Sequence, residues 1–288
     1  MTTEKRVKLE IEAIDGVSQQ LSKKIKDYLL SDYKKLADEF ELVRESKRRN
    51  RKIFKYDSGS KVYYIKVLRS KRFAKLLENL FIPEGFRYFK LSKQLLELDI
   101  PVVKPIMAVK VKKSLLRNDA VFVTEEFKAK NLREYLKQDK LSEIDLALRI
   151  KIMKSLARIW AKLINHNFLH QDPTPANFLL KLEQRDFELS LVDVDDIYCL
   201  PWQPKRMAIH SLARFCSKFF SHLVRTGNEV LLTRKERFFF FKELYQNYQT
   251  QVDFKDFVRE INQLTIKKLL KRGHRDLIKQ SKIMKEFL

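Results

Sequence analysis

The sequence predicts an α+β fold in which a strand-rich N-terminal part precedes a mostly helical C-terminal part. Runs of β-branched and aromatic residues, bounded by turn residues, occupy 40–68 and 102–126. Apolar residues recur at helical spacing through most of 131–288. The change of pattern near 127–130 is the expected boundary, and 288 residues provide enough core for two lobes.

The N-terminal part begins with a basic amphipathic pattern at 17–39, which predicts a helix. Strands are expected at 40–46, 51–56, 61–68, 102–111 and 119–126, with a turn at Asp57-Ser58-Gly59-Ser60. Helices are expected at 70–81 and from Pro83 to the Asp99-Ile100-Pro101 stop. The second helix carries a stripe of Tyr88, Leu91, Leu95 and Leu98, with Glu84 at its head, so this face should be buried.

The C-terminal part begins with a short helix at 131–138 and a long one at 142–167. Short strands at 178–182 and 188–194 interrupt the helical pattern. Three or four basic helices fill 205–288. The basic faces, above all 267–288, either bind an anionic surface or are simply solvated.

Composition narrows the classes of protein. The chain has 60 Lys and Arg against 37 Asp and Glu, a net charge of +23, which suits nucleic acid, anionic lipid or a phosphorylated or acidic substrate. Its five glycines exclude the glycine-rich loops that cradle phosphates. Cys199 and Cys216 lack metal-site spacing and indicate reduced thiols. Neither a secretory signal nor a membrane-spanning stretch is expected.

One segment combines several chemically useful side chains. His170 and Asp172 precede Asn177 in a loop between the long helix and a short strand, and Asp193 ends the next strand. Alone, each is readily a turn, cap or surface residue, but the combined spacing favours a catalytic site. His170 is expected to fix the loop by hydrogen bonding, and zinc is improbable because H-E-x-x-H is incomplete.

This pattern, H-x-D-x-x-x-x-N followed by a strand-end aspartate, resembles the protein-kinase-like fold. The proline-containing loop at 172–178 and the acidic run at 193–196 resemble the lipopolysaccharide core kinases, which phosphorylate heptose or Kdo, and the opening helix and strand resemble their heptose II kinase branch. The resemblance spans roughly 20–250. It implies two lobes: an N-terminal helical extension at 1–39 packed on an N-lobe at 40–127, and a helical C-lobe at 128–288.

The resemblance also implies roles for individual residues. Asp172 would be the catalytic base, and Asn177 and Asp193 would bind Mg²⁺, with Asp195 either a further metal ligand or the partner of a basic neighbour. Lys66 would hold the α- and β-phosphates of ATP. The family's partner glutamate would fall near Tyr88, where this chain has no acid, so the position of the apolar stripe favours Glu84 one turn earlier, with Glu78 and Glu97 as rivals. At the hinge, around Glu125 and Phe127, main-chain groups would bind adenine.

Two departures from the family pattern change the expectations. The loop Ser46–Asn50 has no glycine, so basic side chains at 47–52 are expected to replace the main-chain phosphate contacts. Gln171 stands where many protein kinases have arginine, which makes regulation by a phosphorylated activation loop doubtful.

The expected function is ATP-dependent phosphorylation of a sugar hydroxyl in the lipopolysaccharide inner core, heptose ahead of Kdo. The protein would be cytoplasmic, with an anionic membrane surface as a partner at the inner face of the cytoplasmic membrane and no nucleic acid. One alternative is an atypical protein kinase or small-molecule phosphotransferase of the same fold. Another is a basic nucleic-acid-binding or membrane-binding pseudokinase. The oligomeric state stays open.

Overall fold

The computed structural model describes residues 8–14, 19–30, 40–46, 51–69, 83–112, 118–137, 144–202, 204–225 and 234–280. The chain divides into two compact units. Unit 1 comprises Met1–Glu97 and Val103–Phe127, and unit 2 comprises Leu98–Val102 and Lys128–Leu288. The helix expected at 70–81, with Glu78, and most of the basic loop at 47–52 lie outside the described residues.

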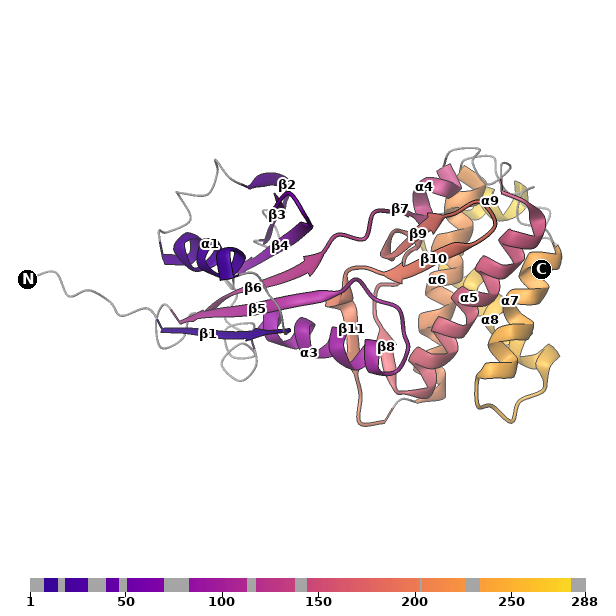
Figure 1. Cartoon of the computed structure of the whole chain (residues 1–288). Helices are drawn as coiled ribbons and strands as arrows, with labels where there is room; N and C mark the ends of the chain where they lie inside the picture. The colour runs from indigo at the N-terminus through magenta and orange to yellow at the C-terminus, as the bar shows by residue number, and fades with distance from the viewer. Residues whose placement is uncertain are drawn as a thin grey trace, which may run out of the picture. The chain divides into compact units, whose positions relative to one another are not determined.

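Unit 1 is built on a six-stranded antiparallel sheet with the order β1-β5-β6-β4-β3-β2 (Figure 1). Its strands are β1 (Lys8–Ala13), β2 (Glu41–Ser46), β3 (Arg51–Asp57), β4 (Val62–Arg69), β5 (Pro105–Lys112) and β6 (Asn118–Glu125). The expected turn closes the β3–β4 hairpin, where Gly59 has a φ of 84° that glycine adopts without strain. The five expected strands are therefore present within a few residues of their predicted bounds.

Strand β1 differs from the helical extension expected over 1–39. Its residues pair with β5 and continue the sheet, and the helix of this region, α1, covers Gln19–Leu30. The alternation of Leu9, Ile11 and Ala13 is the signal for a strand. An alternation of apolar and charged residues over only six positions is a weak signal for a strand. The strand conformation is selected by the pairing of this segment with β5.

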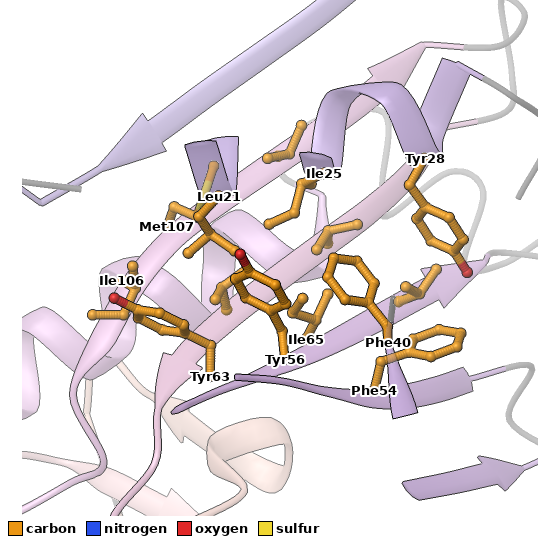
Figure 2. Close-up of a cluster of buried hydrophobic side chains, with 14 of the residues drawn as sticks. Leu21, Ile25, Tyr28, Phe40, Phe54, Tyr56, Tyr63, Ile65, Ile106 and Met107 are labelled. Carbon is orange, nitrogen blue, oxygen red and sulfur yellow. The ribbon is translucent and has the colours of Figure 1, made fainter. Parts of the chain in front are cut away.

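Helix α1 covers one face of this sheet. Leu21, Ile25 and Tyr28 are at most 2% exposed and pack with aromatic and aliphatic residues of β3, β4 and β5 (Figure 2). The rings of Tyr28 and Phe54 meet edge to face at 5.6 Å. Each large apolar side chain buried in this way contributes about 1.5–3 kcal/mol. Because Ile65 points into this core, the neighbouring Lys66 must point to the other face of the sheet.

Helix α3 (Glu84–Glu97) covers that other face, against β5 and β6. Its predicted apolar stripe is confirmed for Tyr88, Leu91 and Leu95, which are buried. A Cβ at Gly85 would lie 2.8 Å from the main-chain oxygen of Val121, so only glycine allows the helix to approach β6 this closely. The close approach places the first turn of α3 over the middle of the sheet.

Unit 2 is mainly helical, as predicted (Figure 1). Its helices are α4 (Leu132–Lys137), α5 (Leu146–Asn165), α6 (Lys205–Arg225), α7 (Arg234–Asn247), α8 (Phe254–Lys271) and α9 (Arg275–Gln280). The strands β7 (Lys130–Asn131), β9 (Phe178–Leu182) and β10 (Phe187–Leu191) form one small sheet, and β8 (Phe168–His170) and β11 (Ile197–Cys199) form another. Helix α5 packs against α7, and α6 packs against α8.

Helix α5 shows how sequence determines local structure in this unit. Asp145 caps its N-terminus, because the carboxylate accepts a hydrogen bond of 2.9 Å from the N–H of Ala147. Apolar residues at helical spacing are buried along it, among them Ile152, Leu156, Ile159 and Leu163, and Leu156 and Leu163 are fully inaccessible to solvent. Within the described residues, no helix has the length and apolar character needed to cross a membrane.

Candidate active site

The loop after β8 is anchored at both of its ends. His170 pairs with Ile197 of β11, and the N–H of Gln171 donates to the carbonyl oxygen of Asp196 at 2.7 Å. The loop then enters a single 3₁₀ turn at Pro175–Asn177. Proline is well suited to this first position, because the N–H it lacks would have no partner there. These contacts hold the loop against the chain that follows β10.

Asn177 and Asp193 come together through the β9–β10 hairpin. Phe178 pairs with Leu191, and the N–H of Val192 donates to the carbonyl oxygen of Asn177 at 2.8 Å. Asp193 follows directly, with φ 67° and ψ 65°. This left-handed conformation is uncommon for a residue other than glycine and is often found at functional sites. The hairpin therefore brings two oxygen-bearing side chains to its open end.

His170 holds the side chain of Asn177. The imidazole is 1% exposed, and burial lowers its pKa to about 4, so the ring is neutral near pH 7. Its Nε2 lies 3.2 Å from the Asn177 amide nitrogen. The amide nitrogen can only donate, so Nε2 accepts, and the Asn177 carbonyl oxygen is left for another ligand. This contact agrees with the loop-fixing role expected for His170.

Asp172 lies on the exposed side of the same loop, with about half of its side chain open to solvent. The ammonium of Lys218, on α6, donates to its Oδ1 at 2.5 Å. Lys218 is not among the residues predicted for the site. Nothing local marks it, because 46 residues separate it from Asp172 and only the packing of α6 brings the two together.

Asn177 and Asp193, at the end of the hairpin, carry side-chain oxygens of the type that binds Mg²⁺. Amide and carboxylate oxygens are the ligands that Mg²⁺ prefers, and this ion usually adds waters and substrate phosphates to one or two protein ligands. In the described part of the chain, no three His, Cys, Asp or Glu side chains gather closely enough to hold a metal by themselves. Asp195 is 3% exposed. Its part in binding the metal stays a prediction.

In unit 1, Lys66 lies in the middle of β4, between Ile53 of β3 and Phe122 of β6. Its ammonium is 5.7 Å from the centre of the Tyr88 ring on α3. A cation this close to an aromatic face is attracted to it. The lysine predicted to hold phosphates therefore points to the face of the sheet that α3 covers.

Arg51, at the start of β3, joins the same group. Its Nη2 donates to the Tyr88 hydroxyl at 3.1 Å and lies 3.5 Å from Glu84 Oε1. Glu84 was predicted at this position, whereas Arg51 was covered only by the prediction for the basic side chains at 47–52. Glu97, the rival of Glu84, is exposed at the far end of α3. The guanidinium of Arg87 lies 4.9 Å from the centre of the Tyr88 ring, so three cations, Lys66, Arg51 and Arg87, lie close to Tyr88.

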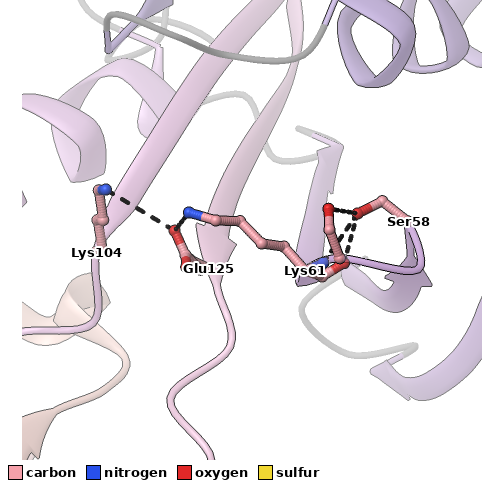
Figure 3. A network of polar contacts seen from close by, with 5 residues as sticks. Ser58, Lys61, Lys104 and Glu125 are labelled. Atoms are coloured by element: carbon pink, nitrogen blue, oxygen red, sulfur yellow. Dashed lines mark hydrogen bonds and ion pairs between the residues drawn. The ribbon is translucent and has the colours of Figure 1, made fainter.

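The predicted hinge follows β6. The Glu125 carboxylate accepts from Lys61 at 3.0 Å and lies 3.9 Å from the Lys104 ammonium (Figure 3). Its hydrogen bond raises the pKa of Lys61. The N–H of Glu126 donates to the carbonyl oxygen of Val62 at 2.8 Å. Lysines thus surround the Glu125 carboxylate, and Phe127 is the last residue of unit 1.

Comparisons with known proteins identify the family and the fold. The model of the lipopolysaccharide kinase (Kdo/WaaP) family matches residues 34–222, more than half of the chain. A solved structure described as WaaP in complex with acyl carrier protein matches with a TM-score of 0.60 and 17% identity, over 82% of this chain and 88% of that one. No curated protein matches. These findings confirm the predicted kinase-like fold. The chain belongs to the lipopolysaccharide kinase (Kdo/WaaP) family and is a phosphotransferase whose acceptor is an alcohol group of the lipopolysaccharide core.

Proposed function

We propose that this protein transfers the γ-phosphate of ATP to a heptose hydroxyl of the lipopolysaccharide inner core, with Kdo as the alternative acceptor. The observation that carries the proposal is the anchored loop with Asp172 and Asn177, tied by the β9–β10 hairpin to Asp193. Heptose is placed ahead of Kdo because the opening helix and strand resemble the heptose II kinase branch.

Asp172 would act on the acceptor. Its half-exposed carboxylate can accept the proton of a sugar hydroxyl as the oxygen attacks the γ-phosphorus. The new bond joins the sugar oxygen to phosphorus, the bond from phosphorus to the β–γ bridging oxygen breaks, and ADP leaves. Lys218 would orient the carboxylate and offset negative charge near the transferred group.

Asn177 and Asp193 would hold Mg²⁺ through their side-chain oxygens, and Asp195 is proposed as a further ligand. When bound, the ion neutralises phosphate charge and aligns the nucleotide. His170 would keep the Asn177 carbonyl oxygen turned toward the ion, because Nε2 occupies the amide nitrogen.

Unit 1 would bind the rest of the nucleotide. Lys66 would contact the α- and β-phosphates, with Glu84 orienting it and Arg51 supplying part of the charge that a glycine-free loop cannot offer through its main chain. Main-chain groups of Glu125 and Phe127 would bind adenine. In this proposal, residues 40–127 form the N-lobe, with 1–39 packed on it, and 128–288 form the C-lobe.

The protein would work at the inner face of the cytoplasmic membrane, where it would meet the lipid-linked acceptor. Its net charge of +23 would attract it to anionic lipid. This part of the proposal predicts that the protein sediments with phosphatidylglycerol vesicles at low salt and is released at high salt.

The decisive experiment is mass spectrometry of the lipopolysaccharide core from a strain that lacks this chain. Loss of one phosphate mass from a heptose would support the proposal, and loss from Kdo would select the alternative sugar. An unchanged core, together with ATP-dependent labelling of protein, would favour a protein kinase. Failure to bind Mg-ATP, with RNA binding that weakens steeply with salt, would favour a pseudokinase.

A further inference from the structure

Four basic side chains lie on the two packed helices that carry the partner of Asp172. Arg214 and Lys218 are four residues apart on α6, and Lys268 and Arg272 are four residues apart at the end of α8. Residues at this spacing lie on one face of a helix. Helices α6 and α8 pack against each other, and the Thr265 hydroxyl lies within 3.5 Å of the carbonyl oxygen of Ala213.

A buried hydroxyl connects the two pairs. The Arg272 guanidinium donates to the Ser217 hydroxyl at 3.1 Å, and this hydroxyl donates to the carbonyl oxygen of Arg214 at 2.9 Å. Ser217 is fully buried and precedes Lys218, which holds Asp172. Arg272 is exposed, and this hydrogen bond ties its guanidinium to the turn of α6 that carries Lys218, the partner of the candidate base.

The cluster is electrostatically unfavourable as it stands. Burial together with Arg214, Arg272 and Lys271 lowers the pKa of Lys268. Burial and Arg214 lower the pKa of Arg272, and Asp172 acts in the opposite direction. In the described part of the chain, no ion pair joins Arg214, Lys268 or Arg272 to a carboxylate. Cations held this close would be stabilised by an anion between them.

We propose that Arg214, Lys218, Lys268 and Arg272 form a subsite that binds a phosphate or carboxylate group of the acceptor glycolipid and so presents its hydroxyl to Asp172. This inference rests on the proposed function. Kdo is an acidic sugar, so a carboxylate lies close to hydroxyls in the inner core. A guanidinium matches both geometries with paired hydrogen bonds, and the ammonium groups add point charges.

The position of the cluster favours the acceptor over the nucleotide. The proposed Mg²⁺ ligands come from the β9–β10 hairpin, whereas these cations come from α6 and α8. Their direct link to the site is Lys218 on Asp172, the group that would receive the acceptor proton. A subsite here would lower the KM for the acceptor and leave the KM for ATP unchanged.

The test compares Arg272→Gln, Lys268→Gln and the double variant in steady-state kinetics. The acceptor is core oligosaccharide freed of its acyl chains, from a strain lacking this chain. Each single variant should raise the acceptor KM about tenfold, as expected when one charge-assisted contact is lost, and the KM for ATP should stay within about twofold. Lys255→Gln is the matched control, because this exposed lysine lies in the first turn of the same helix. Its constants should equal those of the unmodified protein.

Each other outcome has a definite meaning. An unchanged acceptor KM, or a rise confined to ATP, would overturn the subsite. So would variants that bind the soluble oligosaccharide normally but lose binding to phosphatidylglycerol vesicles, since the cluster would then be a lipid contact. If the unmodified protein transfers no phosphate to the oligosaccharide, the proposed function fails. Equilibrium binding of the fluorescently labelled oligosaccharide then decides the subsite separately, and equal affinity in the double variant would overturn it.

Discussion

The candidate site of unit 2 is assembled from a short stretch of chain, whereas that of unit 1 is assembled from distant ones. Asp172, Asn177 and Asp193 are joined by one hairpin and its flanking loops. By contrast, Arg51 reaches across 33 residues to Glu84 and 37 to Tyr88. The site of unit 2 can therefore be recognised from the spacing of its residues in the sequence. The site of unit 1 depends on how α3 packs on the sheet.

This difference has a consequence for mutation. In unit 2, Asp172, Asn177 and Asp193 each have a separate proposed role in catalysis or metal binding. The loss of any one of these side chains should remove activity while the fold persists. In unit 1, Lys66, Arg51 and Arg87 all lie close to Tyr88, so the loss of one cation should be partly compensated. Three site variants test this contrast, and a fourth variant tests the packing of α3 on the sheet.

Asp193→Gly should reduce kcat by at least about a thousandfold, because a metal-binding carboxylate is removed. The melting temperature should not fall, since glycine adopts the left-handed conformation of φ 67° without strain. Asn167→Gly is the control, with a comparable φ of 59° outside the site, and should keep full activity. An active Asp193→Gly enzyme would refute the metal assignment.

Lys66→Met should lower kcat/KM by about a hundredfold, mainly through the KM for ATP, because Arg51 would still supply one cation near the phosphates. The double variant Lys66→Met with Arg51→Met should lose far more than Lys66→Met alone. If Lys66→Met by itself removes all measurable activity, the two cations do not compensate each other.

His170→Gln should lower activity by about 10–100-fold and raise the Mg²⁺ concentration needed for half-maximal rate, because the Asn177 amide is no longer held. Titration of the rate with Mg²⁺ measures this shift. A variant with lower kcat but an unchanged Mg²⁺ requirement would show that His170 supports the fold and not the metal ligand.

Gly85→Ala should destabilise the protein by about 1–3 kcal/mol, because its Cβ would lie 2.8 Å from the main-chain oxygen of Val121. Ser92→Ala, on the buried face of the same helix, is the matched control. It should cost little, since it removes a hydroxyl that has no hydrogen-bond partner among the described residues. Urea unfolding followed by circular dichroism compares the two.

Particular elements show where prediction from sequence succeeded. The β3–β4 hairpin and helix α5 were predicted within a few residues, because turn chemistry, capping and apolar periodicity act over neighbouring residues. Strand β1 was missed, since its pairing with β5 spans about a hundred residues and its own alternation is short. Lys218 was missed for the same reason, because its partner Asp172 lies on a different element.

The family, the α+β class and the spacing of Asp172, Asn177 and Asp193 could be read from residue types at short separations along the chain. The side chains that contact these residues became known only from the folded structure. It placed Arg51 on Glu84, His170 on Asn177 and Lys218 on Asp172. The packing of α6 and α8 also gathers four of the basic side chains that give the chain its net charge of +23, namely Arg214, Lys218, Lys268 and Arg272. These contacts join side chains from separate elements, and only the packing of the helices and sheets brings such partners within hydrogen-bonding distance.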